Sequence, residues 1–323
     1  MKAKVGIIGG AGYTAGELLR ILVNHPNVDI SFVHSSSNAG KKLYEIHEGL
    51  IGETNMVFSD RHPLGDIDIL FLCSAHGASK IFWEENHRPE KLKVIDLSQD
   101  FRDESDGYVY GLPEINLERI KKADSIANPG CFATAIQLSL LPLAASGLLP
   151  VEGDINITAL TGSTGAGVKP AATTHFSWRT GNISIYKPFT HQHLKEISMT
   201  LSRLQSDFSS RINFIPLRGD FARGIFAVTT LDCSLSQEEI TNLYKAFYTE
   251  APFVFVTDFP IDLKQVVNTN KAIINLLVHQ GKLLISCAID NLLKGASGQA
   301  VQNMNIVLGI DQTVALHLKP SAF

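Results

Sequence analysis

Two different patterns of apolar and polar positions follow one another along the chain. Over residues 1–130, short continuous apolar runs alternate with stretches of helical periodicity. The runs that predict strands are KVGIIG, DISFVHS, DIDILFLCS and LKVIDLS, and the stretches that predict helices are AGELLRILVNHP and ASKIFWEEN. Because apolar strands separated by helices are typical of βαβ units, this part predicts a doubly wound parallel sheet in an α/β fold.

From residue 131 the strands are longer, and several of them alternate in polarity. After the apolar helix FATAIQLSLLPL they read DINITALTGS, INFIPLRG, GIFAVTTLDCS, QVVNTNKAIINLLVHQ and KLLISCAID. Such alternation predicts an antiparallel sheet with one covered face. The segments QEEITNLYKAFYTE and LKEISMTLSRL predict helices packed on that sheet. Residues 131–290 are therefore expected to form an α+β domain with a mainly antiparallel sheet, followed by a last helical stretch.

A glycine-rich turn, GGAGYTAGE, joins the first strand to the first helix. Gly9 permits a tight turn, Gly12 lets the backbone approach a pyrophosphate, and Ala15 is small enough for close packing of helix on strand. With the strand before it and the helix after it, the turn predicts a Rossmann-type dinucleotide site that includes Tyr13 and Thr14.

The end of the second strand, VHSSSNAGKK, discriminates between cofactors. NAD-selective folds place an acidic residue there to bind the ribose 2′-hydroxyl, and this segment has none. Ser35, Ser36 and Ser37 can donate hydrogen bonds, and Lys41 and Lys42 can offset a 2′-phosphate. We therefore expect NADP(H). The alternative is a solvated turn with two surface lysines, which is uninformative about the cofactor.

One cysteine lies in a distinctive context, ANPGCFATA. Asn128 is a favoured N-cap and Pro129 suits the first helical position, so Cys131 is expected in the first turn of a buried helix. There the unpaired N–H groups and the helix dipole favour a thiolate. The alternative is that Cys131 is a small buried apolar residue.

Two histidines begin a later helix in THQHLKEISMTLSRL. The apolar residues of this helix form one stripe, which leaves His191 and His193 at an expected exposed tip. Because no further ligand cluster completes a metal site, we expect no metal and assign the imidazoles to proton transfer. A surface helix cap is the alternative.

A second glycine-rich loop, TALTGSTGAGVKP, follows a strand of the second domain. Its N–H groups can form an anion-binding nest, with Ser163, Thr164 and Lys169 as further donors. The alternative is an ordinary turn.

Composition excludes several classes of protein. The net charge of −4 over 323 residues gives no basis for binding nucleic acid or an anionic membrane. Four widely spaced cysteines suit a reducing cytoplasm, and no signal peptide or membrane span is expected. A nicotinamide site, an activated cysteine and an imidazole together suggest thiolate attack on an activated acyl group with hydride transfer.

Nine motifs in order carry a family resemblance that spans nearly the whole chain. They are GGAGYTAGELLRIL, SNAGK, FLCSAHGAS, VIDLSQDFR, VYGLPEIN, NPGCFATA, STGAG, HQHLKEI and IDNLLKGASGQAVQNMN. The sequence resembles the N-acetyl-γ-glutamyl-phosphate reductase family, the arginine-biosynthesis branch of the aspartate-semialdehyde dehydrogenase superfamily. The resemblance implies NADPH-dependent reduction of an N-acyl-γ-glutamyl phosphate through a cysteine thioacyl intermediate. It also implies a homo-oligomer and a second domain used for catalysis and dimerisation.

The resemblance also assigns residues. It implies Cys131 as the nucleophile and one histidine of HQH as the acid/base, with a preference for His191 over His193. It implies a last helix, 291–323, that completes the nucleotide domain. The residues that it places at the substrate are Arg102, Asn128 and Ser163, and those near the cofactor are Asn291, Lys294 and Gly295.

Departures from the family pattern put the acyl group of the substrate in question. Phe132 and Ala133 replace the usual Tyr and Pro, Val168 replaces a common arginine, and Leu217 replaces a common histidine. Arg218 is an added cation, which suggests a succinyl carboxylate as its ligand. The alternative is a surface pair between Arg218 and Asp220.

Two other functions stay open on the sequence. One is aspartate-semialdehyde dehydrogenase-like activity, which is the same chemistry on a shorter, unacylated substrate. The other is a non-catalytic NADP-binding sensor that retains the fold. Loss of function on thiol alkylation, with protection by substrate, would distinguish an enzyme from a sensor.

Overall fold

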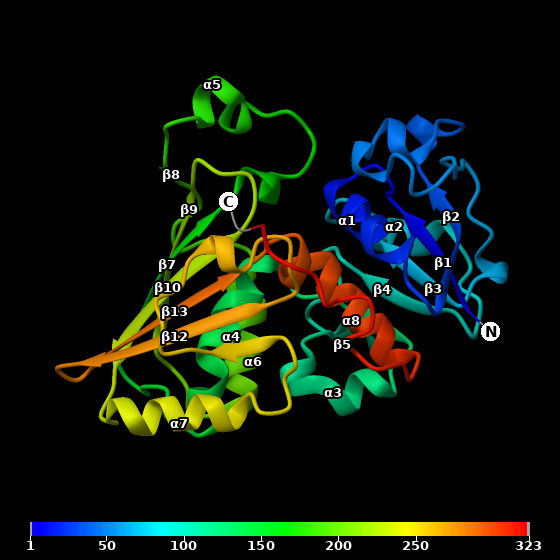
Figure 1. Ribbon diagram of the computed structural model, residues 1–323. Coiled ribbons are helices and arrows are strands. Elements are labelled where there is room, and N and C mark those ends of the chain that lie inside the picture. The colour runs from blue at the N-terminus through cyan, green and yellow to red at the C-terminus, as the bar shows by residue number, and fades with distance from the viewer. Residues whose placement is uncertain (1, 322–323) are drawn as a thin grey trace. The chain divides into compact units, whose positions relative to one another are not determined.

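The computed structural model describes residues 2–321, and its contacts divide the chain into two units (Figure 1). Unit 1 contains Met1–Pro129 and Ala296–His317, and unit 2 contains Gly130–Gly295 and Leu318–Phe323. Because the chain returns after unit 2, its penultimate segment belongs to unit 1.

Unit 1 is built on a six-stranded sheet in which every strand pair is parallel. The strand order is β2-β1-β3-β4-β6-β5. The strands are β1 (Ala3–Ile8), β2 (Val28–His34), β3 (Ile69–Leu72), β4 (Lys93–Asp96), β5 (Val109–Tyr110) and β6 (Ser125–Ala127), and the helices are α1 (Tyr13–Leu22), α2 (Ala78–Glu85), α3 (Pro113–Lys121) and α8 (Gly298–Val307). The predicted doubly wound parallel sheet is confirmed.

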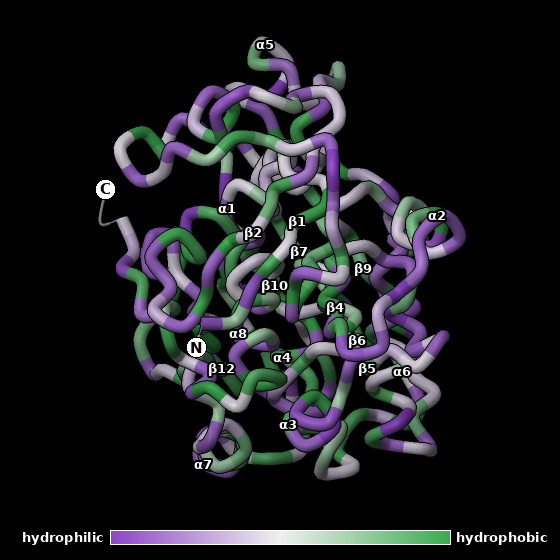
Figure 2. Tube along the Cα trace, turned by 90° about the vertical axis from the view of Figure 1, so that its right-hand side faces the viewer, coloured by the Kyte–Doolittle hydropathy of each residue, from purple (hydrophilic) through white to green (hydrophobic). Residues whose placement is uncertain are grey.

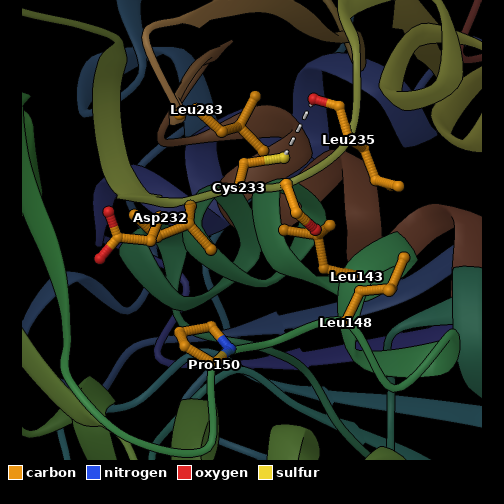
Figure 3. Close-up of a pocket in the computed structure, with 10 residues that line it drawn as sticks. Leu143, Leu148, Pro150, Asp232, Cys233, Leu235 and Leu283 are labelled. Carbon is orange, nitrogen blue, oxygen red and sulfur yellow. Dashed lines mark hydrogen bonds between the residues drawn. The ribbon is translucent and has the colours of Figure 1, made fainter.

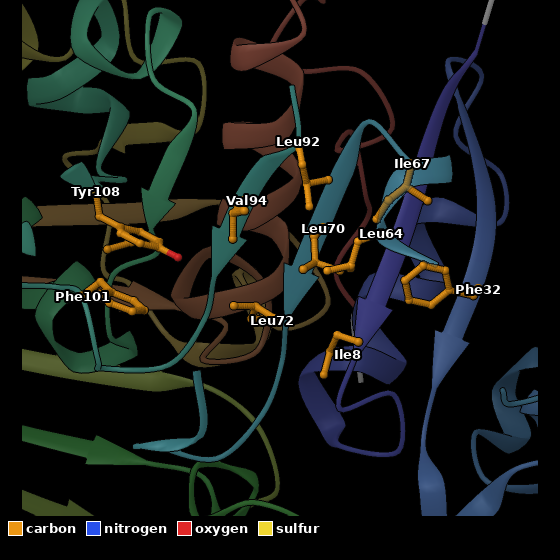
Figure 4. Packing of buried hydrophobic residues seen from close by; sticks show 11 residues of the cluster. Ile8, Phe32, Leu64, Ile67, Leu70, Leu72, Leu92, Val94, Phe101 and Tyr108 are labelled. Atoms are coloured by element: carbon orange, nitrogen blue, oxygen red, sulfur yellow. The ribbon is translucent and has the colours of Figure 1, made fainter. Parts of the chain in front are cut away.

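Both faces of this sheet are covered, which explains its continuous apolar strands. All four residues of β3 are fully buried. On one face Leu70 and Leu72 pack with Ile8 and Phe32, as Figure 4 shows. The cluster extends to a stacked aromatic pair at Phe101, whose ring centroid lies 4.1 Å from that of Tyr108.

Unit 2 is built on a seven-stranded mixed sheet with the order β11-β12-β13-β10-β7-β9-β8. Four of its six strand pairs are antiparallel, so the predicted mainly antiparallel sheet is confirmed. The strands are β7 (Asp154–Thr161), β8 (Ser184–Ile185), β9 (Arg211–Arg218), β10 (Ile225–Asp232), β11 (Val254–Val256), β12 (Ala272–His279) and β13 (Lys282–Ile289), and the helices are α4 (Cys131–Ala145), α5 (Phe176–Arg179), α6 (His193–Leu204) and α7 (Gln237–Phe247).

The apolar helix α4 packs against α6, α7 and the sheet of unit 2. Two tyrosines of the α7 segment fix α4 from the side, because the hydroxyls of Tyr244 and Tyr248 donate to the carbonyls of Ser139 and Leu138. Although α4 is strongly apolar, it is only 15 residues long. Within residues 2–321, no helix has both the length and the apolar character that crossing a bilayer requires.

Two predicted elements end differently in the structure. The strand predicted over residues 265–280 begins only at Ala272, because Asn268 has a left-handed φ of 68° and its N–H donates to Asp290. The helix predicted over 291–323 is also wrong in extent. A π-helical turn, Leu293–Ser297, leads into α8, which ends before Gly309, a glycine with a φ of 68°. Residues 322–323 of that prediction lie outside the described residues.

Candidate active site

The start of α4 presents Cys131 as its first helical residue. Gly130 is the N-cap, with an extended φ of −71° and ψ of 149°, so the predicted cap at Asn128 is wrong by two residues. Cys131 nevertheless lies in the first turn and is partly exposed. A Cβ on Gly295 would lie 2.8 Å from the Cβ of Cys131, so only glycine allows the chain to pass this close to the thiol.

Asn128 and Arg102 both stabilise the segment that leads into this helix. The Asn128 amide donates to the carbonyl of Ala296 and accepts from the amide of Asn303. Arg102 Nε donates to the carbonyl of Asn128 at 2.9 Å, and its Nη2 donates to that of Leu97. Both side chains are buried. The structure therefore gives both residues a positioning role, while their contact with substrate stays a prediction.

His191 and His193 are buried, so the predicted exposed tip is wrong. Their exposed fractions are 5% and 6%, because α6 packs against α4 and aromatic rings enclose both imidazoles. The ring of Phe132 lies edge-on to each, with centroids 5.4 Å and 6.2 Å away. Phe132, one of the departures from the family pattern, thus lies against both imidazoles from the first turn of α4.

The two imidazoles have different surroundings. Burial lowers the pKa of His191 to about 4, and the positive charge of Lys187 acts in the same direction. Its Nδ1 accepts the backbone N–H of His193 at 3.3 Å, which suits a neutral ring. His193 instead lies beside a carboxylate, because its Nε2 is 3.9 Å from Oε1 of Glu196.

Glu196 is a site residue that the sequence argument missed. Its side chain is 4% exposed, and its Oε2 accepts the backbone N–H of Gly130 at 3.0 Å. One carboxylate thus accepts a hydrogen bond from the residue before Cys131 and also lies beside the imidazole of His193. The spacing His193-x-x-Glu196 places both on one helix face and was the available sequence signal.

Arg218 ends β9 near the same imidazoles and does not pair with Asp220 in the described part of the chain. Its guanidinium carbon lies 4.7 Å from the ring centroid of Tyr186, and its Nη1 donates to Thr173 Oγ1. Arg218 Nε is buried with no hydrogen-bond partner among residues 2–321. Asp220 instead accepts the N–H of Gly181 at 2.6 Å.

Tyr186 connects Arg218 with the rest of the site. Its ring centroid lies 5.8 Å from that of His191. Burial raises the pKa of Tyr186, a negative charge on Cys131 acts in the same direction, and Arg218 opposes both. The phenol is therefore expected to stay neutral and able to donate a hydrogen bond across the physiological pH range.

The loop Gly162–Gly167 is not an open nest, because most of its N–H groups are used. Those of Gly162, Ser163 and Thr164 donate to carbonyls of the facing segment 221–224, and those of Gly165 and Gly167 donate within the loop. This arrangement agrees with the turn interpretation. The hydroxyl of Ser163 is the part of the loop that stays a candidate for the substrate.

The candidate cofactor residues near the end of unit 2 are also buried. Asn291 joins two loops, since its Oδ1 accepts the N–H of Gly224 and its Nδ2 donates to Thr164 Oγ1. Lys294 is fully buried. Their predicted contact with a cofactor stays a prediction, and the contacts seen are internal.

The first turn of unit 1 fits a dinucleotide. Gly9 has a φ of 76°, and a Cβ there would lie 2.8 Å from the carbonyl carbon of Cys73. Gly12 is the N-cap of α1, and an added Cβ would meet nothing closer than 3.7 Å, so its backbone is accessible to a ligand. Tyr13, Thr14 and Ala15 form the first helical turn, whose N–H groups have no acceptors within the helix.

A polar network follows the end of β2. The amide of Asn38 donates to the hydroxyls of Ser35 and Ser37, each at 3.2 Å, and accepts from the ammonium of Lys41. Residue 36 begins the short 3-10 turn between these hydroxyls. The predicted donors to a 2′-phosphate therefore gather in one turn, whereas Lys42 donates to the carbonyl of Asn55.

The other cysteines of unit 2 lie apart from this arrangement. Burial raises the pKa of Cys287 to about 12. Cys233 borders a cavity of about 420 Å³ that Figure 3 shows, where leucine side chains surround it and its Sγ lies 3.8 Å from the carbonyl oxygen of Leu235. No group of three or more His, Cys, Asp or Glu side chains in residues 2–321 is arranged to hold a metal ion.

Comparisons with known families and sequences agree over both units. Residues 4–123 match the family model described as semialdehyde dehydrogenase, NAD binding domain, and residues 131–291 match semialdehyde dehydrogenase, dimerisation domain. The N-acetyl-gamma-glutamyl-phosphate reductases of Parabacteroides distasonis and Bacteroides thetaiotaomicron are 60% and 58% identical over 322 residues. That of Flavobacterium johnsoniae is 54% identical over 326 residues, and each alignment covers 99% of both chains.

Solved structures share the fold at low identity. Aspartate semialdehyde dehydrogenase II from Vibrio cholerae, complexed with ASA, gives a TM-score of 0.73 at 17% identity, covering 96% of this chain and 99% of that one. Aspartate semialdehyde dehydrogenase with NADP from Candida albicans gives 0.70 at 14% identity, covering 97% and 100%. At these identities the likeness shows the fold alone.

Proposed function

Because the chain belongs to the N-acetyl-γ-glutamyl-phosphate reductase family of semialdehyde dehydrogenases, oxidoreductases of arginine biosynthesis, we propose that Cys131 carries the acyl group during reduction. The substrate is an N-acyl-γ-glutamyl phosphate and the product is the N-acyl-glutamate semialdehyde. The observation that carries the proposal is the position of Cys131 as the first residue of α4, in the same unit as two buried imidazoles.

The reaction follows from the groups in unit 2. The Cys131 thiolate attacks the acyl carbon, the bond from that carbon to the phosphate oxygen breaks, and inorganic phosphate leaves with the electron pair. When held at the turn from Gly9 to Ala15, NADPH would supply the hydride that reduces the resulting thioester. An imidazolium then protonates the developing alkoxide, and the same imidazole takes that proton back as the carbon–sulfur bond breaks. The aldehyde leaves and the thiolate is restored.

We assign the acid/base role to His193 rather than to His191, which the sequence favoured. A group that both gives and takes a proton near neutral pH needs a pKa close to that pH. His191 has a pKa of about 4 and is therefore a poor acid at pH 7. The carboxylate of Glu196 beside His193 favours the protonated ring.

The substrate assay tests the function directly. NADPH consumption is expected with N-acetyl-γ-glutamyl phosphate or its N-succinyl analogue, because the family acts on N-acylated five-carbon substrates. With aspartyl phosphate, the rate is expected to be lower by more than about a hundredfold. Faster turnover of aspartyl phosphate would instead support the aspartate-semialdehyde dehydrogenase alternative. NADPH binding without turnover of any acyl phosphate would support the sensor.

The cofactor preference is expected to depend on the turn after β2. Ser36→Asp should lower kcat/KM for NADPH relative to NADH by at least fivefold, because a carboxylate there repels the 2′-phosphate. Ser234→Asp makes the same charge change at an exposed position of unit 2 and should leave the ratio unchanged. Equal use of both cofactors by the unmodified enzyme would show that this turn does not select the phosphate.

We also propose that the sheet of unit 2 mediates self-association. Helices α4 and α7 cover one face of this sheet. Strand β10 alternates fully buried residues with half-buried ones such as Phe226 and Val228, and Leu277 of β12 is 53% exposed. The apolar residues on this second face support packing against the same face of another copy.

A further inference from the structure

The side chain of Glu196 joins the two groups that the proposed reaction uses. Its Oε2 accepts the N–H of Gly130 at 3.0 Å, directly before Cys131, and its Oε1 lies 3.9 Å from Nε2 of His193. The side chain is 4% exposed, so water screens its charge little. The contact with Gly130 joins residues 66 positions apart, because α6 packs on α4.

This contact has an electrostatic cost that calls for an explanation. The N–H groups at the start of α4 favour an anion, and Glu196 uses one of them. A negative charge beside Cys131 also disfavours the thiolate. Both effects oppose the nucleophile, whereas the same charge favours protonation of His193. A buried glutamate in this position is therefore useful when the Cys131 thiolate and the protonated His193 ring form together, because its charge stabilises the protonated ring.

We propose that Glu196 is a positioning residue that fixes the first turn of α4 and keeps His193, rather than His191, able to carry a proton. The proposal rests on the proposed function of Cys131. The carboxylate fixes the position of the Cys131 backbone through its hydrogen bond with the N–H of Gly130. Its negative charge raises the proton affinity of His193. His191, which lacks such a carboxylate in the described residues, stays a neutral wall of the site.

Other titratable groups face this pair from neighbouring elements and must be considered in any pH profile. They are Cys131 of α4, Lys187 and His191 of the segment before α6, Tyr186 after β8 and Arg218 of β9. The positive charge of Lys187 lowers the proton affinity of His191, whereas Arg218 acts on Tyr186. Among these groups an ionised Cys131 is the other one that favours a protonated ring, so Glu196 supplies that effect before the thiol ionises.

The charge is tested with Glu196→Gln, which can still accept the Gly130 N–H through its amide oxygen. We expect kcat to fall at least fivefold, with KM for both substrates within twofold, and the basic limb of the kcat profile, where His193 loses the proton that it donates, to move to lower pH. Glu239→Gln is the matched control, because Glu239 accepts the N–H of its own helix cap, Ser236, on α7. It should change neither kcat nor the profile.

A second measurement does not depend on how well the variant folds. Proton NMR titration of the unmodified protein, with His191→Asn used for assignment, should show His193 titrating at higher pH than His191. The proposal is overturned if His193 titrates below His191, or if Glu196→Gln matches Glu239→Gln. It is also overturned if kcat falls while the basic limb stays in place. If Cys131→Ser keeps its turnover, the proposed function fails, whereas this titration still decides the role of Glu196.

Discussion

Cys131→Ser is expected to lower kcat by more than about a thousandfold while the affinity for NADPH stays within twofold. A serine hydroxyl at this position is a far weaker nucleophile than a thiolate, because its pKa lies far above neutral pH. The proposed cofactor turn, Gly9 to Ala15, belongs to unit 1 and is unchanged by the substitution. Steady-state NADPH oxidation and fluorescence titration of NADPH measure the two effects separately.

Cys233→Ser is the matched control for this experiment. Cys233 belongs to the same unit and is also partly exposed, but it borders the leucine-lined cavity instead of the histidines. Its replacement should leave kcat within twofold. Iodoacetamide should inactivate the unmodified enzyme and the Cys233 variant alike, with protection by the acyl phosphate. Substantial turnover by Cys131→Ser would remove the covalent mechanism.

The parts of the fold that the sequence predicted are those with strong apolar periodicity. Strands β1 and β3 are continuous apolar runs because both faces of their sheet are covered, and β10 alternates because one face is. Helix α3 was missed, since only three of its nine residues are buried and Figure 2 shows it largely in the hydrophilic colour. Strands β5, β8 and β11 are two or three residues long, which is too short for periodicity to show.

The site was predictable where its residues are local and not where they meet through packing. The first turn of α4 and the turn after β1 are sequence-local, so Cys131 and Gly9 could be assigned a place from their neighbours. The burial of His191 could not be predicted from its neighbours in sequence, because Phe132 of α4 and Phe214 of β9 enclose it. The same holds for Glu196, whose bond to Gly130 depends on how α6 packs on α4.

Arg218 is expected to recognise the acyl group of the substrate. The surface pair with Asp220, which competed with this interpretation, is not formed, because Asp220 accepts the N–H of Gly181. Instead the Arg218 guanidinium stacks on Tyr186, and its Nε is buried without a hydrogen-bond partner in the described residues. A buried guanidinium N–H favours an anionic ligand, and a succinyl carboxylate is one that arginine binds in bidentate fashion.

Arg218→Ala is therefore expected to lower kcat/KM for N-succinyl-γ-glutamyl phosphate by more than tenfold. Removing one partner of a desolvated carboxylate–arginine pair costs about 2 to 5 kcal/mol. For the N-acetyl substrate, which has no such carboxylate, the change should stay within about threefold. Parallel progress curves with the two substrates and NADPH measure both values.

Arg211→Ala is the control, because Arg211 begins the same strand, β9, and pairs with Asp154 at its exposed end. It should leave kcat/KM unchanged for both substrates, which separates the role of Arg218 from a general effect on the strand. If Arg218→Ala lowers kcat/KM equally for both substrates, Arg218 acts through Tyr186 and the neighbouring histidines instead of on the acyl group. If the substitution lowers kcat/KM for neither substrate, the buried Nε of Arg218 has no partner on the substrate, and other residues recognise the acyl group.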